Sequence, residues 1–194
     1  MEIILASASP RRRELIKILG KPFSVVTSDA EEIIDPELPP YFVAEKLSLL
    51  KASDVAGKLK NEKKDAIVIG ADTIVVKDGK ILTKPKDEID AQNMLKTLSG
   101  THHSVITGVT VINNKTAKSE SFYVETKVFF KNLTDDEIKK YIETKEPMDK
   151  AGAYGIQEKG ALFVEKIEGD YFNVVGLPIC KLASLLKEEF SVEF

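Results

Sequence analysis

Hydrophobic residues recur along the chain with two spacings, and these spacings predict interleaved strands and helices. Alternating or continuous apolar runs predict strands over residues 2–6, 23–27, 66–76, 80–82, 105–112, 121–130, 161–166 and 171–175. Helical spacing predicts helices over residues 10–19, 43–59, 87–98 and 135–144 and a last helix opened by Pro178, with a polar loop over 60–65. Because hairpins occur among the strand–helix alternations, we expect a mixed sheet with helices on its faces.

Local signals at the element ends support this assignment. Ser9 followed by Pro10 has the form of a helix N-cap with proline at the first helical position. Asp78-Gly79 between two apolar runs predicts a tight hairpin turn. Thr134 with Glu137 three residues later is a capping-box pattern and predicts the start of another helix.

Composition narrows the class of protein without choosing a function. The 194 residues suit one domain or two small lobes, and the net charge of −3 gives no support for a nucleic-acid or membrane surface. The single cysteine, Cys180, excludes an internal disulfide and disfavours a cysteine-based zinc site. No secretory signal or apolar span of membrane length is found, so we expect a cytoplasmic protein.

Three consecutive arginines follow the predicted N-cap. Arg11, Arg12 and Arg13 would lie in the first turn of a helix, where the backbone dipole already disfavours positive charge. Free N–H groups and guanidinium groups at such a place favour an anion, most naturally a phosphate chain. The alternative is that the arginines are solvated or pair with acids elsewhere, since helix phase prevents all three from pointing the same way.

Asp72 is the one charged residue in the most apolar run, residues 66–76. A buried carboxylate needs a metal ion, a cation or hydrogen-bond donors. Glu31-Glu32 follows a predicted strand and could join Asp72 in holding Mg²⁺ or Mn²⁺, although adjacent glutamates are more often a solvated loop. Gly70 next to Asp72 indicates a bulge or a close backbone approach.

Other candidates are less specific. Lys51 and Lys84 could neutralise an anion, although any single lysine is more often a surface residue. Residues 152–176 are rich in glycine, which indicates tight turns or a backbone that approaches a ligand closely, and Gln157 there could read a base edge. His102-His103 would point to opposite faces of a strand, which is poor metal-pair geometry, so we expect one of them to be structural.

Several short motifs together resemble the Maf family of nucleotide pyrophosphatases. They are Leu5-Ala6-Ser7-Ala8-Ser9-Pro10-Arg11-Arg12, Gly70-Ala71-Asp72-Thr73, Lys84-Pro85, Leu98-Ser99-Gly100, His103-Ser104-Val105, residues 149–157 (DKAGAYGIQ) and residues 169–179 (GDYFNVVGLPI). Each is weak alone, but they span nearly the whole chain in the family's order.

The resemblance implies a fold and an activity. It implies an α/β fold over residues 1–194, similar to the ITPases, with an elongated mixed sheet and two lobes around a central cleft. It implies hydrolysis of nucleoside triphosphates to the monophosphate and pyrophosphate, with dependence on a divalent cation. The combination of Arg11, Thr73 and Gln157 is similar to the subgroup that prefers dTTP and UTP.

The resemblance also suggests a role for each candidate residue. Ser7, Arg11 and Arg12 would contact the triphosphate, and Thr73 and Gln157 would contribute to base choice. Glu32 and Asp72 would hold the metal ion, and Asp72 would also be the proton acceptor that activates water. Lys51 and Lys84 would neutralise charge as it moves to the leaving group.

Two alternatives stay open at this point. One is a housecleaning pyrophosphatase for purine nucleotides such as ITP and XTP. The other is a non-catalytic regulator of septum formation that senses nucleotides. The family is linked with cell-division arrest and the removal of modified nucleotides, and a homodimer is consistent with the resemblance.

Overall fold

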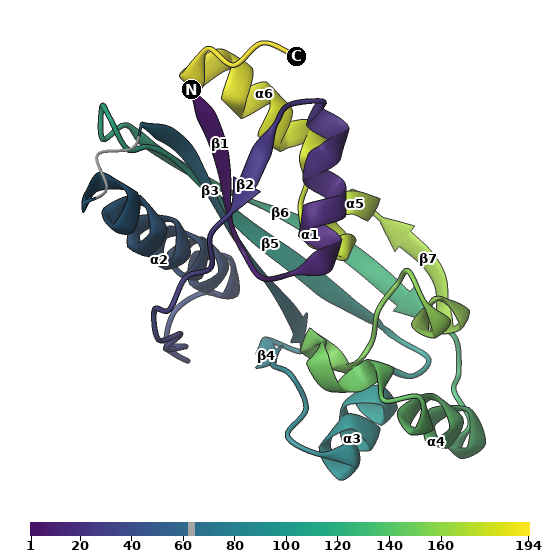
Figure 1. Ribbon diagram of the computed structural model, residues 1–194. Coiled ribbons are helices and arrows are strands. Elements are labelled where there is room, and N and C mark those ends of the chain that lie inside the picture. The colour runs from purple at the N-terminus through teal and green to yellow at the C-terminus, as the bar shows by residue number, and fades with distance from the viewer. Residues whose placement is uncertain (62–64) are drawn as a thin grey trace. The chain divides into compact units, whose positions relative to one another are not determined.

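The computed structural model describes residues 1–61 and 65–194, so part of the predicted loop over 60–65 lies outside the described residues. The strands are β1 (Glu2–Ala6), β2 (Phe23–Val25), β3 (Ala66–Lys77), β4 (Lys80–Leu82), β5 (His102–Asn113), β6 (Ser119–Phe130) and β7 (Val164–Glu168). The helices are α1 (Pro10–Ile16), α2 (Pro40–Asn61), α3 (Glu88–Leu98), α4 (Asp135–Glu143), α5 (Tyr171–Val175) and α6 (Ile179–Phe190) (Figure 1). Short 3₁₀ segments are η1 (Lys17–Leu19), η2 (Glu146–Asp149), η3 (Ala151–Ala153) and η4 (Lys159–Phe163).

The strands form one mixed sheet, as the sequence predicts. Their order is β2-β1-β3-β5-β6-β7, with β4 paired to β3. β1 runs parallel to β2 and β3, whereas the β3–β4 and β6–β7 pairs are antiparallel. Across the described residues, none of the helices has the length and apolar character needed to cross a membrane.

The chain divides into two compact units. The first unit comprises Met1–Asp72, Thr107–Val124 and Gly176–Phe194, and the second comprises Thr73–Ile106 and Glu125–Val175. The boundaries fall within β3, β5 and β6, so each of these long strands contributes residues to both units.

In the first unit the sheet is covered on two faces. Ile4 and Ala6 of β1 pack with Val55 of α2. The alternate residues Ile3 and Leu5 are also buried and point to the opposite face. Figure 1 shows α2 on one side of β1 and β3, and α1 and α6 on the other side.

In the second unit α3 and α4 supply much of the core. Leu95, Leu98 and Ile138 are almost completely buried and belong to one cluster with Phe130 of β6. The predicted capping box is confirmed, because Thr134 Oγ1 accepts a hydrogen bond from Glu137 N–H and Glu137 Oε2 accepts one from Thr134 N–H.

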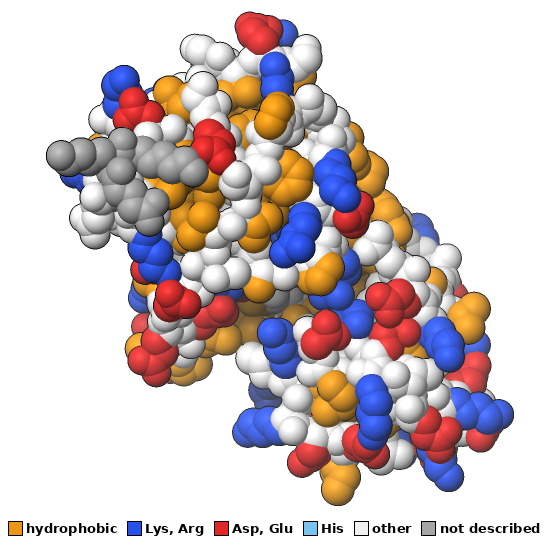
Figure 2. Space-filling model, viewed as in Figure 1, with side chains coloured by type: hydrophobic (Ala, Val, Ile, Leu, Met, Phe, Trp, Pro, Cys, Tyr) orange, Lys and Arg blue, Asp and Glu red, His pale blue; other side chains and the backbone are white. Residues whose placement is uncertain are grey.

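Acidic and basic side chains are interspersed over the face shown in Figure 2. Ion pairs among surface side chains of the described residues include Lys58–Asp29, Lys118–Glu189 and Lys140–Asp136. Such pairs contribute little stability individually. The mixture of the two signs leaves no broad patch of one charge on the face in Figure 2.

Two strand predictions near the C-terminus need correction. Residues 171–175 form helix α5, and the strand predicted over 161–166 begins only at Val164, after η4. The β-rich composition of 171–175 is overridden by tertiary hydrogen bonds. Asn173 is fully buried and its Nδ2 donates to Val105 O and Thr126 Oγ1 at 3.0 and 2.9 Å. Asp170 Oδ1 accepts from Phe172 N–H, which favours a helical turn.

The prediction that one of the two adjacent histidines is structural is confirmed. His103 is 2 % exposed, and its Nε2 shares a 2.7 Å hydrogen bond with the hydroxyl of Tyr154. Within the described residues, His103 Nδ1 has no hydrogen-bond partner. Burial, with a smaller contribution from the charge of Lys77, lowers the pKa of His103 to about 3, so the folded protein holds this imidazole neutral.

We expect this buried imidazole to make the protein less stable as the pH falls below about 6.5, because only the unfolded chain can protonate it. Between pH 7.5 and 5 the free energy of unfolding should fall by about 2 kcal/mol from this group. Urea unfolding of the wild type and His103→Gln at both pH values measures the effect. The variant should lack this part of the pH dependence, and an equal decrease in both proteins would contradict the assignment.

Candidate active site

Ser9, in the first unit, is the N-cap of α1, as the sequence predicts. Ser9 caps α1 with extended backbone angles, Pro10 occupies the first turn, and Arg13 N–H donates to Ser9 O at 3.2 Å. Ser7 Oγ, at the end of β1, accepts from Ser9 N–H at 3.2 Å. This hydrogen bond fixes the turn between β1 and α1.

The arginines of α1 differ in their surroundings. Arg13 is exposed and Arg11 is half-buried, whereas Arg12 is 9 % exposed. Arg12 Nε donates to Gly176 O at 2.7 Å, and its Nη1 donates to Ser7 Oγ at 3.3 Å. Arg12 therefore ties the turn after β1 to the segment before α6, a role that the sequence did not reveal.

Arg12 also belongs to a group of charges. Burial lowers the pKa of its guanidinium, and the negative charges of Asp72 and Glu32 act in the opposite direction. A buried cation needs such compensation. Arg12 thus contributes positive charge close to the two carboxylates that the sequence singles out.

Lys51 of α2 joins these two carboxylates. Its Nζ lies 2.5 Å from Asp72 Oδ1 and 2.9 Å from Glu32 Oε1. The side chains of Lys51 and Asp72 are only 15 % and 11 % exposed, while that of Glu32 is 48 % exposed. The cation that a buried Asp72 requires is therefore Lys51, which brings three of the predicted site residues together.

Helix α2 approaches β3 closely enough to make this contact. Gly70 and Asp72 are two residues apart on β3 and so face the same side of the sheet. A Cβ on Gly70 would overlap Ser48 O and lie 2.8 Å from Ala52 N. The predicted close backbone approach at Gly70 is confirmed. It brings α2 near enough to the sheet for Lys51 to contact Asp72.

The neighbouring strand β5 shows the same feature. A Cβ on Gly108 would overlap the backbone carbonyl of Ala44, one helical turn before Ser48. Gly108 is not among the residues that the sequence patterns single out, although a lone glycine inside an alternating strand is a signal of such a close approach.

A line of hydroxyl groups, from buried Ser48 and Thr110 to exposed Ser121, also fixes α2 on the sheet. Ser48 is fully buried and its Oγ lies 2.8 Å from Thr110 Oγ1 on β5. Thr110 Oγ1 lies 2.8 Å from Ser121 Oγ on β6. Because buried polar groups are costly when unpaired, these contacts favour one rotation of α2 over others.

The donor set fits a divalent cation that also binds phosphate. Across residues 1–61 and 65–194, no group of three or more His, Cys, Asp or Glu side chains could hold a metal ion. Glu32 and Asp72 offer hard carboxylate oxygens from two residues. Mg²⁺ is commonly bound by one or two carboxylates together with water and substrate phosphates. This pair of carboxylates therefore suits an ion that shares its ligands with a substrate, and not an ion held by protein side chains alone.

The second unit contains the remaining predicted residues. Thr73 is half-buried on β3, and Lys84 and Gln157 are exposed. Thr83, next to Lys84, accepts a hydrogen bond from Gly152 N–H through its carbonyl at 3.2 Å. The residue before Lys84 is therefore hydrogen-bonded to the glycine-rich segment that leads to Gln157.

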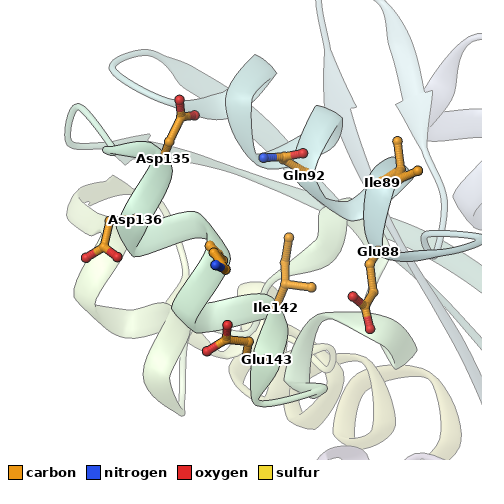
Figure 3. A pocket seen from close by; sticks show the side chains of 8 residues that line it. Glu88, Ile89, Gln92, Asp135, Asp136, Ile142 and Glu143 are labelled. Atoms are coloured by element: carbon orange, nitrogen blue, oxygen red, sulfur yellow. The ribbon is translucent and has the colours of Figure 1, made fainter.

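The second unit also has a groove between α3 and α4, with a volume of ≈ 460 Å³ (Figure 3). Its lining residues are Glu88, Ile89, Gln92, Asp135, Asp136, Lys139, Ile142 and Glu143. Three of its acids pair with lysines: Glu88 with Lys145, Asp135 with Lys96 and Asp136 with Lys140. The groove includes none of the predicted site residues.

Comparison with known proteins gives a consistent result. A family model described as "Maf-like protein" matches residues 2–189. A dTTP/UTP pyrophosphatase of Alkaliphilus oremlandii is 58 % identical over 191 residues, covering 98 % of this chain and 97 % of the relative. A dTTP/UTP pyrophosphatase of Thermoanaerobacter sp. strain X514 is 57 % identical over 192 residues, covering 99 % and 98 %.

The contacts of Arg12 predict an effect on stability. Arg12→Lys removes the guanidinium that bonds to Gly176 O and Ser7 Oγ, and we expect a loss of about 1.5–3 kcal/mol. Arg13→Lys on the exposed side of the same turn is the matched control and should change stability by less than about 0.5 kcal/mol. Chemical denaturation measures both. Equal effects would mean that Arg12 does not tie the two segments together.

The close approach of α2 predicts a second effect. Gly70→Ala places a methyl group against the α2 backbone, and we expect it to destabilise the protein by about 1–3 kcal/mol. Gly57→Ala, at an exposed position of α2 with no atom within 4 Å of the added Cβ, should stabilise it by up to about 1 kcal/mol. Urea unfolding of both variants distinguishes them. A neutral Gly70→Ala would show that the packing of α2 is not this close.

Proposed function

Because the chain belongs to the Maf-like protein family, we propose that it is a nucleoside triphosphate pyrophosphatase that hydrolyses dTTP and UTP to the monophosphate and pyrophosphate. The observation that carries this proposal is the Glu32–Lys51–Asp72 group, in which Lys51 and Asp72 are largely buried, with Arg12 nearby. It combines a carboxylate that can accept a proton with cations that can stabilise phosphate charge. The names of relatives matched over almost their whole length support the choice of dTTP and UTP.

Asp72 is the proton acceptor in this proposal. Its Oδ1 is bonded to Lys51, and a carboxylate has further lone pairs for a second partner. Asp72 takes a proton from a water molecule, and the water oxygen attacks the α-phosphorus. The bond from the α-phosphorus to the oxygen that bridges it to the β-phosphorus breaks, and that oxygen leaves with its electron pair as part of pyrophosphate. The proton on Asp72 returns to solvent.

Positive side chains would stabilise the charge that moves to the leaving group. Lys51 is held in place before substrate arrives, because α2 is fixed by Gly70 and by the Ser48–Thr110 contact. Such preorganised electrostatics contribute more than flexible surface charges. We propose that Lys84 shares this role, and that Ser7, Arg11 and Arg12 contact the triphosphate.

Glu32 and Asp72 would hold the divalent cation, which we propose is Mg²⁺ or Mn²⁺. When bound, such an ion offsets phosphate charge and polarises the phosphoryl oxygens. Thr73 and Gln157 would act on base choice and not on the chemical step. The cytoplasm suits the exposed free thiol of Cys180, and a homodimer stays a prediction of the family resemblance.

The test is a substrate panel of dTTP, UTP, ITP and XTP with Mg²⁺, in which monophosphate, pyrophosphate and orthophosphate are quantified. We expect turnover of dTTP and UTP with pyrophosphate as the second product. Asp72→Asn should lower kcat by roughly 10²–10⁴-fold, the usual contribution of a general base. The control is Asp78→Asn, the same change at the exposed hairpin turn after β3, where asparagine suits the backbone φ of 49°.

Each other outcome would contradict a specific part of the proposal. Hydrolysis of ITP and XTP in preference to dTTP would contradict the base assignment. Triphosphate binding without turnover would contradict enzymatic activity, and orthophosphate as the product would contradict attack at the α-phosphorus. Normal turnover by a folded Asp72→Asn would exclude Asp72 as the base.

A further inference from the structure

The loop that carries Gln157 is closed at its base. Gly155 N–H donates to the hydroxyl of Tyr141 at 3.2 Å. Lys159 N–H donates to Glu146 Oε2 at 3.1 Å, and Gly160 N–H donates to Glu146 Oε1 at 3.2 Å. The two ends of segment 155–160 are therefore held by two side chains, Tyr141 and Glu146.

These two side chains also bond to each other. The Tyr141 hydroxyl donates to Glu146 Oε1 at 2.7 Å while it accepts from Gly155. Tyr141 is 3 % exposed, and burial followed by the hydrogen bond to Glu146 raises its pKa, so the hydroxyl keeps its proton. Glu146 thus accepts three hydrogen bonds, which uses most of the capacity of one carboxylate.

The glycine positions show how tightly the loop is closed. A Cβ on Gly160 would lie 2.5 Å from Gly155 O, 2.8 Å from Tyr141 Oη and 3.0 Å from Gly155 N. The ends of the loop therefore touch each other and the tyrosine hydroxyl. No side chain larger than hydrogen fits at Gly160 without opening the loop.

The two residues that hold the loop, Tyr141 and Glu146, belong to well-packed structure. Tyr141 lies on α4, whose first turn has the Thr134–Glu137 capping box. Glu146 O accepts a hydrogen bond from Lys150 Nζ at 2.8 Å, and Lys150 is 7 % exposed. In contrast, Gln157 at the turn of the loop is exposed. The backbone at both ends of the loop is therefore hydrogen-bonded, while the Gln157 side chain is exposed and can contact a ligand.

We propose that Tyr141 and Glu146 are positioning residues for base selection, acting through Gln157. This inference rests on the proposed function, in which Gln157 contacts the base. Thymine and uracil present the same N3–H donor flanked by carbonyl acceptors, and a glutamine amide offers one donor and one acceptor in return. Such recognition requires a backbone held within a fraction of an ångström, because a displaced amide loses both bonds.

The test uses Tyr141→Phe and Glu146→Gln, each of which weakens the hydrogen bonding at the loop base with little change in volume; Tyr141→Phe removes the bonds to Gly155 and Glu146. We expect each to lower the ratio of kcat/KM for dTTP over ITP by roughly tenfold, which is the worth of about one hydrogen bond. The loss should appear mainly in KM. Glu143→Gln, an exposed change on the same helix α4, is the matched control and should keep the wild-type ratio.

A double-mutant cycle with Gln157→Ala separates positioning from general destabilisation. If Glu146 acts through Gln157, Glu146→Gln should not lower the dTTP/ITP ratio further in the Gln157→Ala background. An equal further decrease in both backgrounds would overturn the inference.

Hydrogen exchange supplies a measurement that is independent of turnover. The amide of Gly155 should exchange at least about tenfold faster in Tyr141→Phe than in the Glu143→Gln control, because it loses the hydroxyl that accepts its hydrogen bond. Unchanged exchange, or faster exchange with an unchanged dTTP/ITP ratio, would overturn the positioning role of Tyr141 and Glu146 but leave the proposed function intact. Lack of dTTP and UTP turnover by the wild type would overturn the proposed function itself.

Discussion

The ammonium group of Lys51 between Asp72 and Glu32 is the contact on which the candidate active site depends. Asp72 lies in the most apolar strand of the chain, where a carboxylate without a partner would be very costly. Lys51 can serve as that partner only because α2 packs directly on Gly70 and Gly108. A larger side chain at either glycine would move α2 away from the sheet and would separate Lys51 from Asp72.

This constraint suits phosphoryl chemistry. An ion pair that is formed before substrate binds keeps charged groups oriented and partly shielded from water. In the proposed reaction, phosphate oxygens would replace one carboxylate as the partner of Lys51, whose position would change little as charge develops on the leaving group. In the second unit, the Tyr141–Glu146 pair plays a comparable part for the loop of Gln157, since it fixes the backbone and leaves the side chain available.

The sequence predicted features that follow from local pattern. Asp72 stood out as a charge in an apolar strand, and the Ser9 cap followed from a short motif; the structure confirms the burial of Asp72 and the cap at Ser9. Long-range contacts could not be predicted in this way: one partner of Arg12, for example, is a carbonyl 164 residues away. Residues 171–175 were wrongly predicted as a strand, since the hydrogen bonds of Asn173 to two other strands override local propensity.

Hydrolysis of dTTP in ¹⁸O-labelled water tests most directly whether this site sends a water molecule to the α-phosphorus. With Asp72 as the base, a single turnover should place one ¹⁸O in the monophosphate and none in pyrophosphate. Label in pyrophosphate, with unlabelled monophosphate, would mean attack at the β-phosphorus and would contradict the proposed mechanism.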